Sequence, residues 1–122
     1  MIQATLRRLH SPDVQDLASF QPPDPKRVGF LLQILVGPAD GEGEESFDAI
    51  VCTPYWLTGR YGSEDVLNGL HHIIMMEYDF ERLQRFIVSF VSNCRGPTWL
   101  EIAQQLGRLG RWEFEDYKQQ IK

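Results

Sequence analysis

Two adjacent histidines, His71 and His72, are the residues of this chain that first suggest metal chemistry. Imidazole nitrogens bind zinc and other transition metals. These histidines precede an apolar run typical of a β-strand, and neighbouring side chains of a strand point to opposite faces. We therefore expect that the two histidines do not bind one ion together, and no metal site is predicted.

Two cysteines, Cys52 and Cys94, would be nucleophiles if their thiols were ionised. A thiolate forms beside a basic group or at a helix N-terminus. Both cysteines instead lie in apolar settings, without the CxxC or His/Cys spacing of a zinc site, and Cys94 lies at the electrically negative end of an expected helix. The sequence predicts buried free thiols without catalytic function.

Carboxylates gather in two segments, residues 40–48 and 113–116. A pair of carboxylic acids can hydrolyse glycosides if one of them is desolvated in a cleft, which polar, glycine-rich loops seldom provide. The stretch GPADGEG lacks the lysine of a phosphate-binding loop, and its own charges would repel phosphate. Because no acid, base and nucleophile form a matched set, we predict that the protein is not an enzyme and uses no cofactor.

The composition indicates one globular domain that spans residues 1–122, with 43% hydrophobic and 24% charged residues. The formal net charge of −5 argues against nucleic acid or an anionic membrane as the main partner, since both attract clustered lysine and arginine. The N-terminal residues do not have the form of a signal peptide, and no apolar run approaches membrane-spanning length. We expect a cytoplasmic protein whose partner is a basic protein.

Residues 70–94 predict the centre of the fold, a strand followed by an amphipathic helix. Residues 73–76 are apolar at every position, which is typical of an interior strand with both faces buried. Asp79 is placed to cap a helix over residues 80–94. The face of that helix expected to be buried consists of Leu83, Phe86, Ile87, Phe90, Val91 and Cys94.

The N-terminal half predicts three further strands. Residues 2–10 alternate as an edge strand does, and residues 27–37 have the two apolar faces of a central strand. Residues 11–26 contain four prolines and should form a surface loop held to the core by Phe20. A third strand is expected at residues 47–53, after a long acidic hairpin loop.

The rest of the chain predicts turns and a second helix. An aromatic, turn-rich stretch follows Pro54, and residues 63–69 have the pattern of a single helical turn. Thr98 and Glu101 have the spacing of a capping box, and Gly107 or Gly110 can end that helix by adopting a positive φ.

The tail after Gly110 alternates aromatic and acidic residues, as an edge strand or extended segment does. The predicted fold is therefore α+β, a mostly antiparallel sheet of four to five strands. Two helices from the C-terminal half, at residues 80–94 and 98–107, are expected on one face of this sheet.

Four stretches in order, FDAIVCTPYWL, HHIIMMEYD, PTWLEIAQQL and WEFEDY, carry a resemblance to a known family. Over residues 28–117 the chain resembles the immunity proteins of bacterial polymorphic toxin systems, specifically their eighth numbered family; the segment through Lys26 carries none of this likeness. The resemblance implies a small cytoplasmic antidote that neutralises a cognate toxin by binding it, without catalysis.

The toxin-binding residues are predicted from physical chemistry. If the toxin is a nuclease, its active cleft is basic and a carboxylate-rich surface can occupy it. Binding hot spots usually combine aromatic side chains with charge. The predicted residues are Asp40, Glu42, Glu44 and Glu45 of the loop with Tyr55 and Trp56 beside them, and secondarily Glu113, Glu115, Asp116 and Tyr117 of the tail.

Other interpretations of the same residues stay open. The acidic loop can also be interpreted as a solvated turn kept soluble by like charges, and the aromatic residues of the tail as a seal for the sheet edge. The alternative function is a homo-oligomeric interaction module, in which the aromatic residues build a homodimer.

Overall fold

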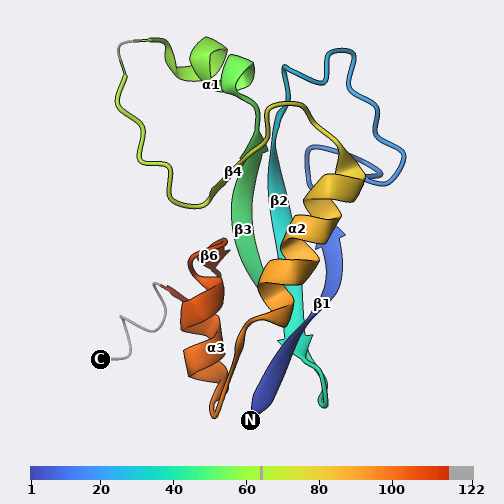
Figure 1. Cartoon of the computed structure of the whole chain (residues 1–122), viewed down its shortest axis with the longest axis vertical. Coiled ribbons are helices and arrows are strands. Elements are labelled where there is room, and N and C mark those ends of the chain that lie inside the picture. Colours follow the sequence, from blue (N-terminus) through green and yellow to red (C-terminus); the bar gives the residue numbers. More distant parts are fainter. Residues whose placement is uncertain (64, 116–122) are drawn as a thin grey trace.

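A curled mixed sheet with helices in front of it organises the chain (Figure 1). The structure is a computed structural model, and it describes residues 1–63 and 65–115. The strands run in the order β4-β3-β2-β1-β5, and β6 also pairs with β3. The predicted α+β class and the single small domain are confirmed. The elements are β1 (Ile2–His10), β2 (Gly29–Pro38), β3 (Glu45–Cys52), α1 (Pro54–Tyr61), β4 (His72–Ile74), α2 (Phe80–Ser92), β5 (Arg95–Gly96), α3 (Trp99–Leu106) and β6 (Arg111–Trp112).

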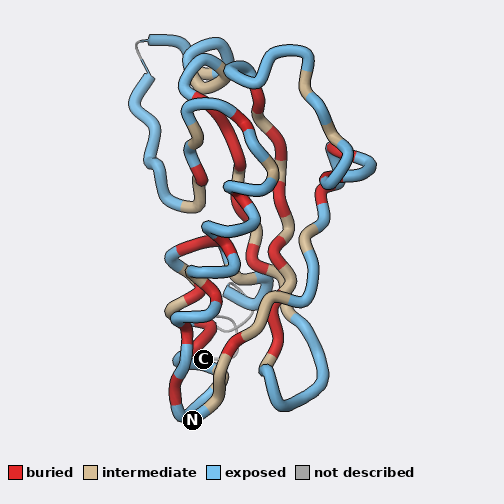
Figure 2. Tube along the Cα trace, turned by 45° about the vertical axis from the view of Figure 1, so that its right-hand side comes forward, coloured by how far each residue is buried: buried red, intermediate tan, exposed pale blue. Residues whose placement is uncertain are grey.

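Strand β2 is the central strand that its sequence predicts. Every second side chain, from Phe30 through Leu32 and Ile34 to Val36, is buried against the helices, whereas the intervening residues are half-buried. Strand β3 alternates in the same way, so buried segments line up across both strands in Figure 2. We call the side of the sheet turned toward α2 the core face and the opposite side the open face.

Helix α2 begins where Asp79 predicts, because the Asp79 carboxylate accepts a hydrogen bond from the Arg82 backbone N–H at 3.2 Å. Leu83, Ile87 and Val91 are buried, as expected. Phe86 is an exception, since 51% of its surface is exposed and the prediction that it is buried is wrong. It lies at the margin of the apolar stripe, beyond the edge of the sheet, where a groove replaces the core.

Strand β4 is an edge strand, so the prediction of an interior strand here is wrong. Only His72–Ile74 are extended, parallel to β3, and the apolar residues Ile74 and Met76 are 48% and 70% exposed. A continuous apolar run is typical of a strand covered on both faces, but burial requires neighbours that the sheet does not supply beyond β4. The run therefore leaves apolar surface at the edge of the molecule.

The segment between β3 and β4 also differs from the prediction. Residues expected to form an aromatic turn make the helix α1, with Pro54 in the first turn, where its missing N–H costs nothing. The single helical turn predicted at 63–69 is absent from the described residues of that segment. A helix was missed here because α1 buries no residue and so lacks an apolar stripe.

The remaining local predictions are largely confirmed. The Thr98 hydroxyl accepts from the Glu101 N–H at 3.2 Å and starts α3 as the capping pattern indicates. Phe20 holds the proline-rich loop through edge-on contacts with Phe30 and Tyr78. Gly107, however, ends α3 with φ of −60°, so the predicted positive φ is wrong at that position.

Two neighbouring residues of α2 test which side chains form the core. We expect Ile87→Ala to lower the free energy of unfolding by about 2–5 kcal/mol, because a fully buried side chain leaves a cavity. Phe86→Ala removes a larger side chain, but from an exposed position, and should cost less than about 1 kcal/mol. Urea denaturation of both variants measures the difference, and equal losses would contradict this assignment.

Candidate functional site

The acidic hairpin, residues 39–44 between β2 and β3, forms one end of the molecule (Figure 1). Asp40 and Glu42 are exposed, and neither makes an ion pair or side-chain hydrogen bond with any residue in the described parts of the chain. Two carboxylates are therefore presented to solvent at the tip. A solvated turn would also show this, so the support beneath the hairpin distinguishes the two interpretations.

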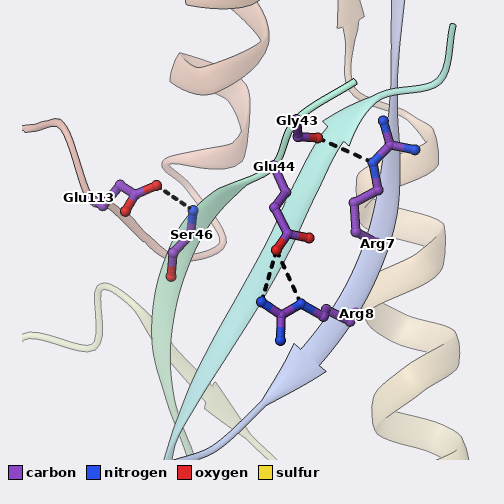
Figure 3. Close-up of polar contacts among 6 residues, drawn as sticks. All are labelled: Arg7, Arg8, Gly43, Glu44, Ser46 and Glu113. Atoms are coloured by element: carbon purple, nitrogen blue, oxygen red, sulfur yellow. Dashed lines mark hydrogen bonds and ion pairs between the residues drawn. The ribbon is translucent and has the colours of Figure 1, made fainter. Parts of the chain in front are cut away.

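Arg7 of β1 holds the hairpin backbone in place. Its guanidinium donates hydrogen bonds to the carbonyl oxygens of Pro38 and Gly41, both at 2.6 Å, and of Gly43 at 3.3 Å (Figure 3 draws the last of these). Arg7 is the extra residue of a β-bulge, because the register with β2 shifts between Leu6 and Arg8. A planar guanidinium with several donors can satisfy three carbonyl groups at once, so the loop is braced rather than loose.

Gly37 makes this close approach feasible. A Cβ atom at Gly37 would lie 2.1 Å from the carbonyl oxygen of Gly43 and 2.7 Å from Nε of Arg7. A side chain at this position would therefore push both the hairpin and its arginine away. The absence of a side chain at residue 37 is a requirement of the brace.

Glu44 and Glu45 point to opposite sides of the sheet, as successive residues of a strand do. On the open face, Glu44 forms an ion pair with Arg8 at 2.9 Å (Figure 3), and this hydrogen bond and charge raise the pKa of the Arg8 guanidinium. On the core face, one oxygen of Glu45 accepts hydrogen bonds from the indole N–H groups of Trp99 at 2.7 Å and Trp112 at 2.8 Å. These two predicted site residues are thus occupied within the protein.

The tail contributes Glu113 to the same end of the molecule. Its carboxylate accepts a hydrogen bond from the Ser46 N–H at 2.9 Å (Figure 3). Its own backbone N–H donates to the Ser46 carbonyl at 3.1 Å. Trp112 is half-buried against the core, so the sealing function considered for the tail aromatics fits this residue. Glu115 is exposed, and the predicted residues Asp116 and Tyr117 lie outside the described residues.

Tyr55 and Trp56 do not join the acidic hairpin. They belong to α1, which follows the end of β3 opposite the hairpin, so most of the length of β3, about 25 Å, separates the two groups. The Trp56 ring packs where a Cβ of Gly29 would be, and Tyr55 is 60% exposed beneath the Arg27 guanidinium. The predicted placement beside the acidic loop is therefore wrong, and their contact with a partner stays a prediction.

The supporting residues Arg7, Arg8, Gly37 and Trp99 were missed by sequence reasoning. Their contacts join β1, the hairpin and α3, which are far apart in the chain, and no local spacing indicates such pairs. The two consecutive arginines in an otherwise alternating strand were the available signal, since charge on both sides of a strand accompanies a bulge or an edge.

The residues first considered for chemistry have structural contacts. His71 Nε2 lies 2.7 Å from the Gly107 carbonyl oxygen, and within the described residues no cluster of histidine, cysteine and carboxylates could hold a metal ion. Both cysteines are free and buried, as predicted. Burial raises the pKa of the Cys94 thiol and raises that of Cys52 to about 11, which suppresses the thiolate form.

The acidic surface braced by Arg7 suits a class of protein that acts by binding a basic protein partner. The sequence comparison agrees with this class. Residues 4–117 match the family described as Immunity protein 8, and the chain belongs to that family. The matched region includes most of the segment before Lys26, which carried none of the predicted likeness. No curated protein and no solved structure gives a match.

Membership makes this chain an immunity protein, a class that has a toxin as its partner and is generally non-catalytic. Across the described residues, none of the helices is long and apolar enough to cross a membrane.

The brace is tested by Arg7→Met. The Ala39 and Gly41 amides are hydrogen-bonded to the Gln3 and Pro38 carbonyls, and loss of the guanidinium should make their hydrogen exchange about tenfold faster. The control Arg8→Met removes the ion pair with Glu44 and leaves the three carbonyl contacts, so exchange at these amides should change little. Equal acceleration by both variants would show that charge, rather than the carbonyl contacts, holds the loop.

The thiols are tested by alkylation. At pH 8 a thiol of pKa about 11 is ionised about a hundredfold less than an ordinary one, so folded protein should react with iodoacetamide at Cys52 at least that much more slowly than unfolded protein. The rate should rise about tenfold between pH 8 and pH 9. Mass spectrometry of the labelled peptides gives both rates, and rapid labelling of the native chain at pH 8 would refute the burial of this thiol.

Proposed function

We propose that this immunity protein neutralises a cognate bacterial toxin by non-catalytic binding, and that the acidic hairpin with Asp40 and Glu42 at its tip enters a basic surface of the toxin. The observation that carries this proposal is the Arg7 brace, which fixes a loop whose outward carboxylates have no partner in the described chain. A turn that served solubility alone would not need three backbone contacts from a neighbouring strand.

Rigidity matters because binding costs conformational entropy. A loop that is already held in one shape loses little freedom when it meets a partner, so more of the interaction energy appears as affinity. Like charges concentrated at one end of an acidic protein also accelerate encounter with a basic partner. Both properties suit an antidote that has to reach a toxin before the toxin reaches its substrate.

A groove beside the hairpin offers apolar contact to a partner, which charged side chains alone do not provide. It has a volume of about 290 Å³ and lies between the hairpin and α3, with Glu42, Pro38, Ile2 and Trp99 in its lining. Interfaces derive most of their energy from a few buried apolar or aromatic anchors within a charged rim. We assign this groove to an apolar side chain of the toxin, with the carboxylates around it pairing with basic residues. A nuclease, whose active cleft is basic, is the toxin class that fits best.

The same proposal includes a cytoplasmic site of action, since the toxin has to be met where its substrate lies. It also treats the protein as an inhibitor rather than an enzyme, with no cofactor. Growth of cells that coexpress this chain with a toxin encoded by a neighbouring gene tests the function directly. Rescue by the intact chain supports the proposal, and failure both to rescue and to bind the toxin would refute it.

The binding surface is tested by the double charge reversal Asp40→Lys with Glu42→Lys. We expect the association rate with the toxin to fall about tenfold or more at 50 mM salt and much less at 500 mM, because exposed charges are screened. Stopped-flow fluorescence at both salt concentrations measures this.

The control for that experiment is Asp65→Lys with Glu77→Lys, which changes the net charge equally at exposed positions in the two connections that flank β4, the strand paired with the end of β3 opposite the hairpin. If the control lowers the rate as much as the hairpin variant, net charge rather than this surface governs association. If neither variant changes the rate, the hairpin is not the binding surface.

A further inference from the structure

A second groove, of about 290 Å³, lies between the outer edge of β4 and helix α2. The four consecutive residues from His72 to Met75 all line it, together with Phe86 and Phe90 of α2. Side chains of consecutive strand residues point to opposite faces, so a groove that touches all four is facing the edge of the strand. Because β4 is the last strand of the sheet order, that edge is not covered by another strand among the described residues.

The hydrogen-bond pattern shows which backbone groups point into this groove. The Ile50 N–H donates to the His71 carbonyl, and the Met75 N–H donates to the Cys52 carbonyl, both at 2.9 Å. In a parallel ladder, residues that bond the neighbouring strand alternate with residues whose N–H and C=O point away from it. The N–H and C=O of Ile74 therefore point outward, where an added strand would bind them.

The walls of this groove are apolar and accessible. Ile74 is 48% exposed and Phe86 is 51% exposed, and the Phe86 and Phe90 ring centroids lie 6.5 Å apart. Large apolar side chains beside an unpaired strand edge are typical of a surface that another chain covers. An added strand would place alternate side chains on the two phenylalanine rings.

The rim of the groove carries positive charge on a protein whose net charge is −5. Arg108 lines it, and no carboxylate in the described chain lies within salt-bridge distance of this guanidinium. Arg82, which also lines it, is exposed and has its nearest carboxylate, Asp79, at 3.8 Å. A second copy paired through a two-fold axis would bring these arginines toward their own counterparts, whereas an acidic segment would neutralise them.

We propose that the groove between β4 and α2 receives an extended segment of a partner protein, added as a further strand on β4, whose side chains turned toward α2 include both apolar and acidic residues. The apolar side chains would cover Phe86 and Phe90, and the acidic ones would meet Arg82 and Arg108. This surface is separate from the hairpin, because β4 pairs with the Ile50–Cys52 end of β3 and the hairpin precedes Glu45. The inference goes beyond toxin neutralisation by the hairpin and does not depend on it.

A capped eight-residue peptide, Glu-Thr-Leu-Thr-Leu-Thr-Glu-Thr, is the probe, because its leucine and glutamate side chains lie on one face of an extended strand. Added to the full chain labelled with ¹⁵N, it should shift the amide signals of residues 72–75 and of Phe86. The same peptide with lysine in place of glutamate should bind at least about tenfold more weakly, because it meets the two arginines. A leucine–glutamate peptide that is N-methylated at alternate residues should also lose binding, since it cannot form strand hydrogen bonds.

Variants of the chain complete the test. Phe86→Ser should abolish the shifts, and Arg82→Gln with Arg108→Gln should weaken binding about tenfold. Val88→Ser is the matched control, because Val88 is 43% exposed on the same helix and lines a different groove, beside β1. Asp40→Lys with Glu42→Lys should leave peptide binding unchanged, which separates this surface from the hairpin.

Four results would overturn the proposal. Equal binding of the glutamate and lysine peptides would refute the charge preference, and equal binding of the N-methylated peptide would refute strand addition. Absence of shifts at millimolar peptide would refute the site. If sedimentation shows a dimer that Phe86→Ser dissociates, the occupant is a second copy of this chain.

Discussion

The buried side of β2 is the constraint on which the other elements depend. Four large apolar side chains, from Phe30 to Val36, have to be removed from water, and they are covered on one face of the sheet by the apolar side chains of α2 and the rest of the core. A strand alternates strictly, so fixing which residues face the helices also fixes which face away. Through the pairing of β2 with β3, this choice extends to every residue of β3.

The division of the acidic residues follows from that alternation. Val36 is opposite Glu45, so Glu45 shares the side of the core and meets the two indole groups there, while Glu44 is turned to the other side toward Arg8. Glu44 and Glu45, where the hairpin joins β3, are therefore both held by contacts within the protein. Charge density in the sequence therefore did not indicate which carboxylates are available, because half of the predicted loop residues serve the fold.

Periodicity predicted the elements whose burial follows one face. The three long strands, both C-terminal helices and their caps at Asp79 and Thr98 were readable because each depends on residues within one turn or one strand. The short elements could not be predicted from periodicity in this way. β4 was read as interior because its residues are apolar, yet position in a sheet depends on the crossover through α1, which the local pattern does not record.

The candidate surface was predictable to a similar extent. The acidic hairpin was found because its composition is local, and the placement of Tyr55 and Trp56 beside it failed because closeness in sequence was taken for closeness in space. For Arg7 the sequence offered only the pair of consecutive arginines as a signal, and its contacts could not be predicted, since its acceptors are main-chain carbonyl groups that every residue possesses. Contacts of this kind leave no trace in residue type at the accepting positions.

The binding of Arg7 to main-chain carbonyl groups has an evolutionary consequence. Because the guanidinium of Arg7 holds the main chain of the hairpin and does not touch the side chains of Asp40 and Glu42, substitutions at the tip leave the frame intact. The two carboxylates proposed to contact the toxin can thus change one at a time while the three backbone contacts of Arg7 stay in place. For the proposed hairpin interface, such separation of scaffold from specificity would let the protein follow changes in the surface of its toxin.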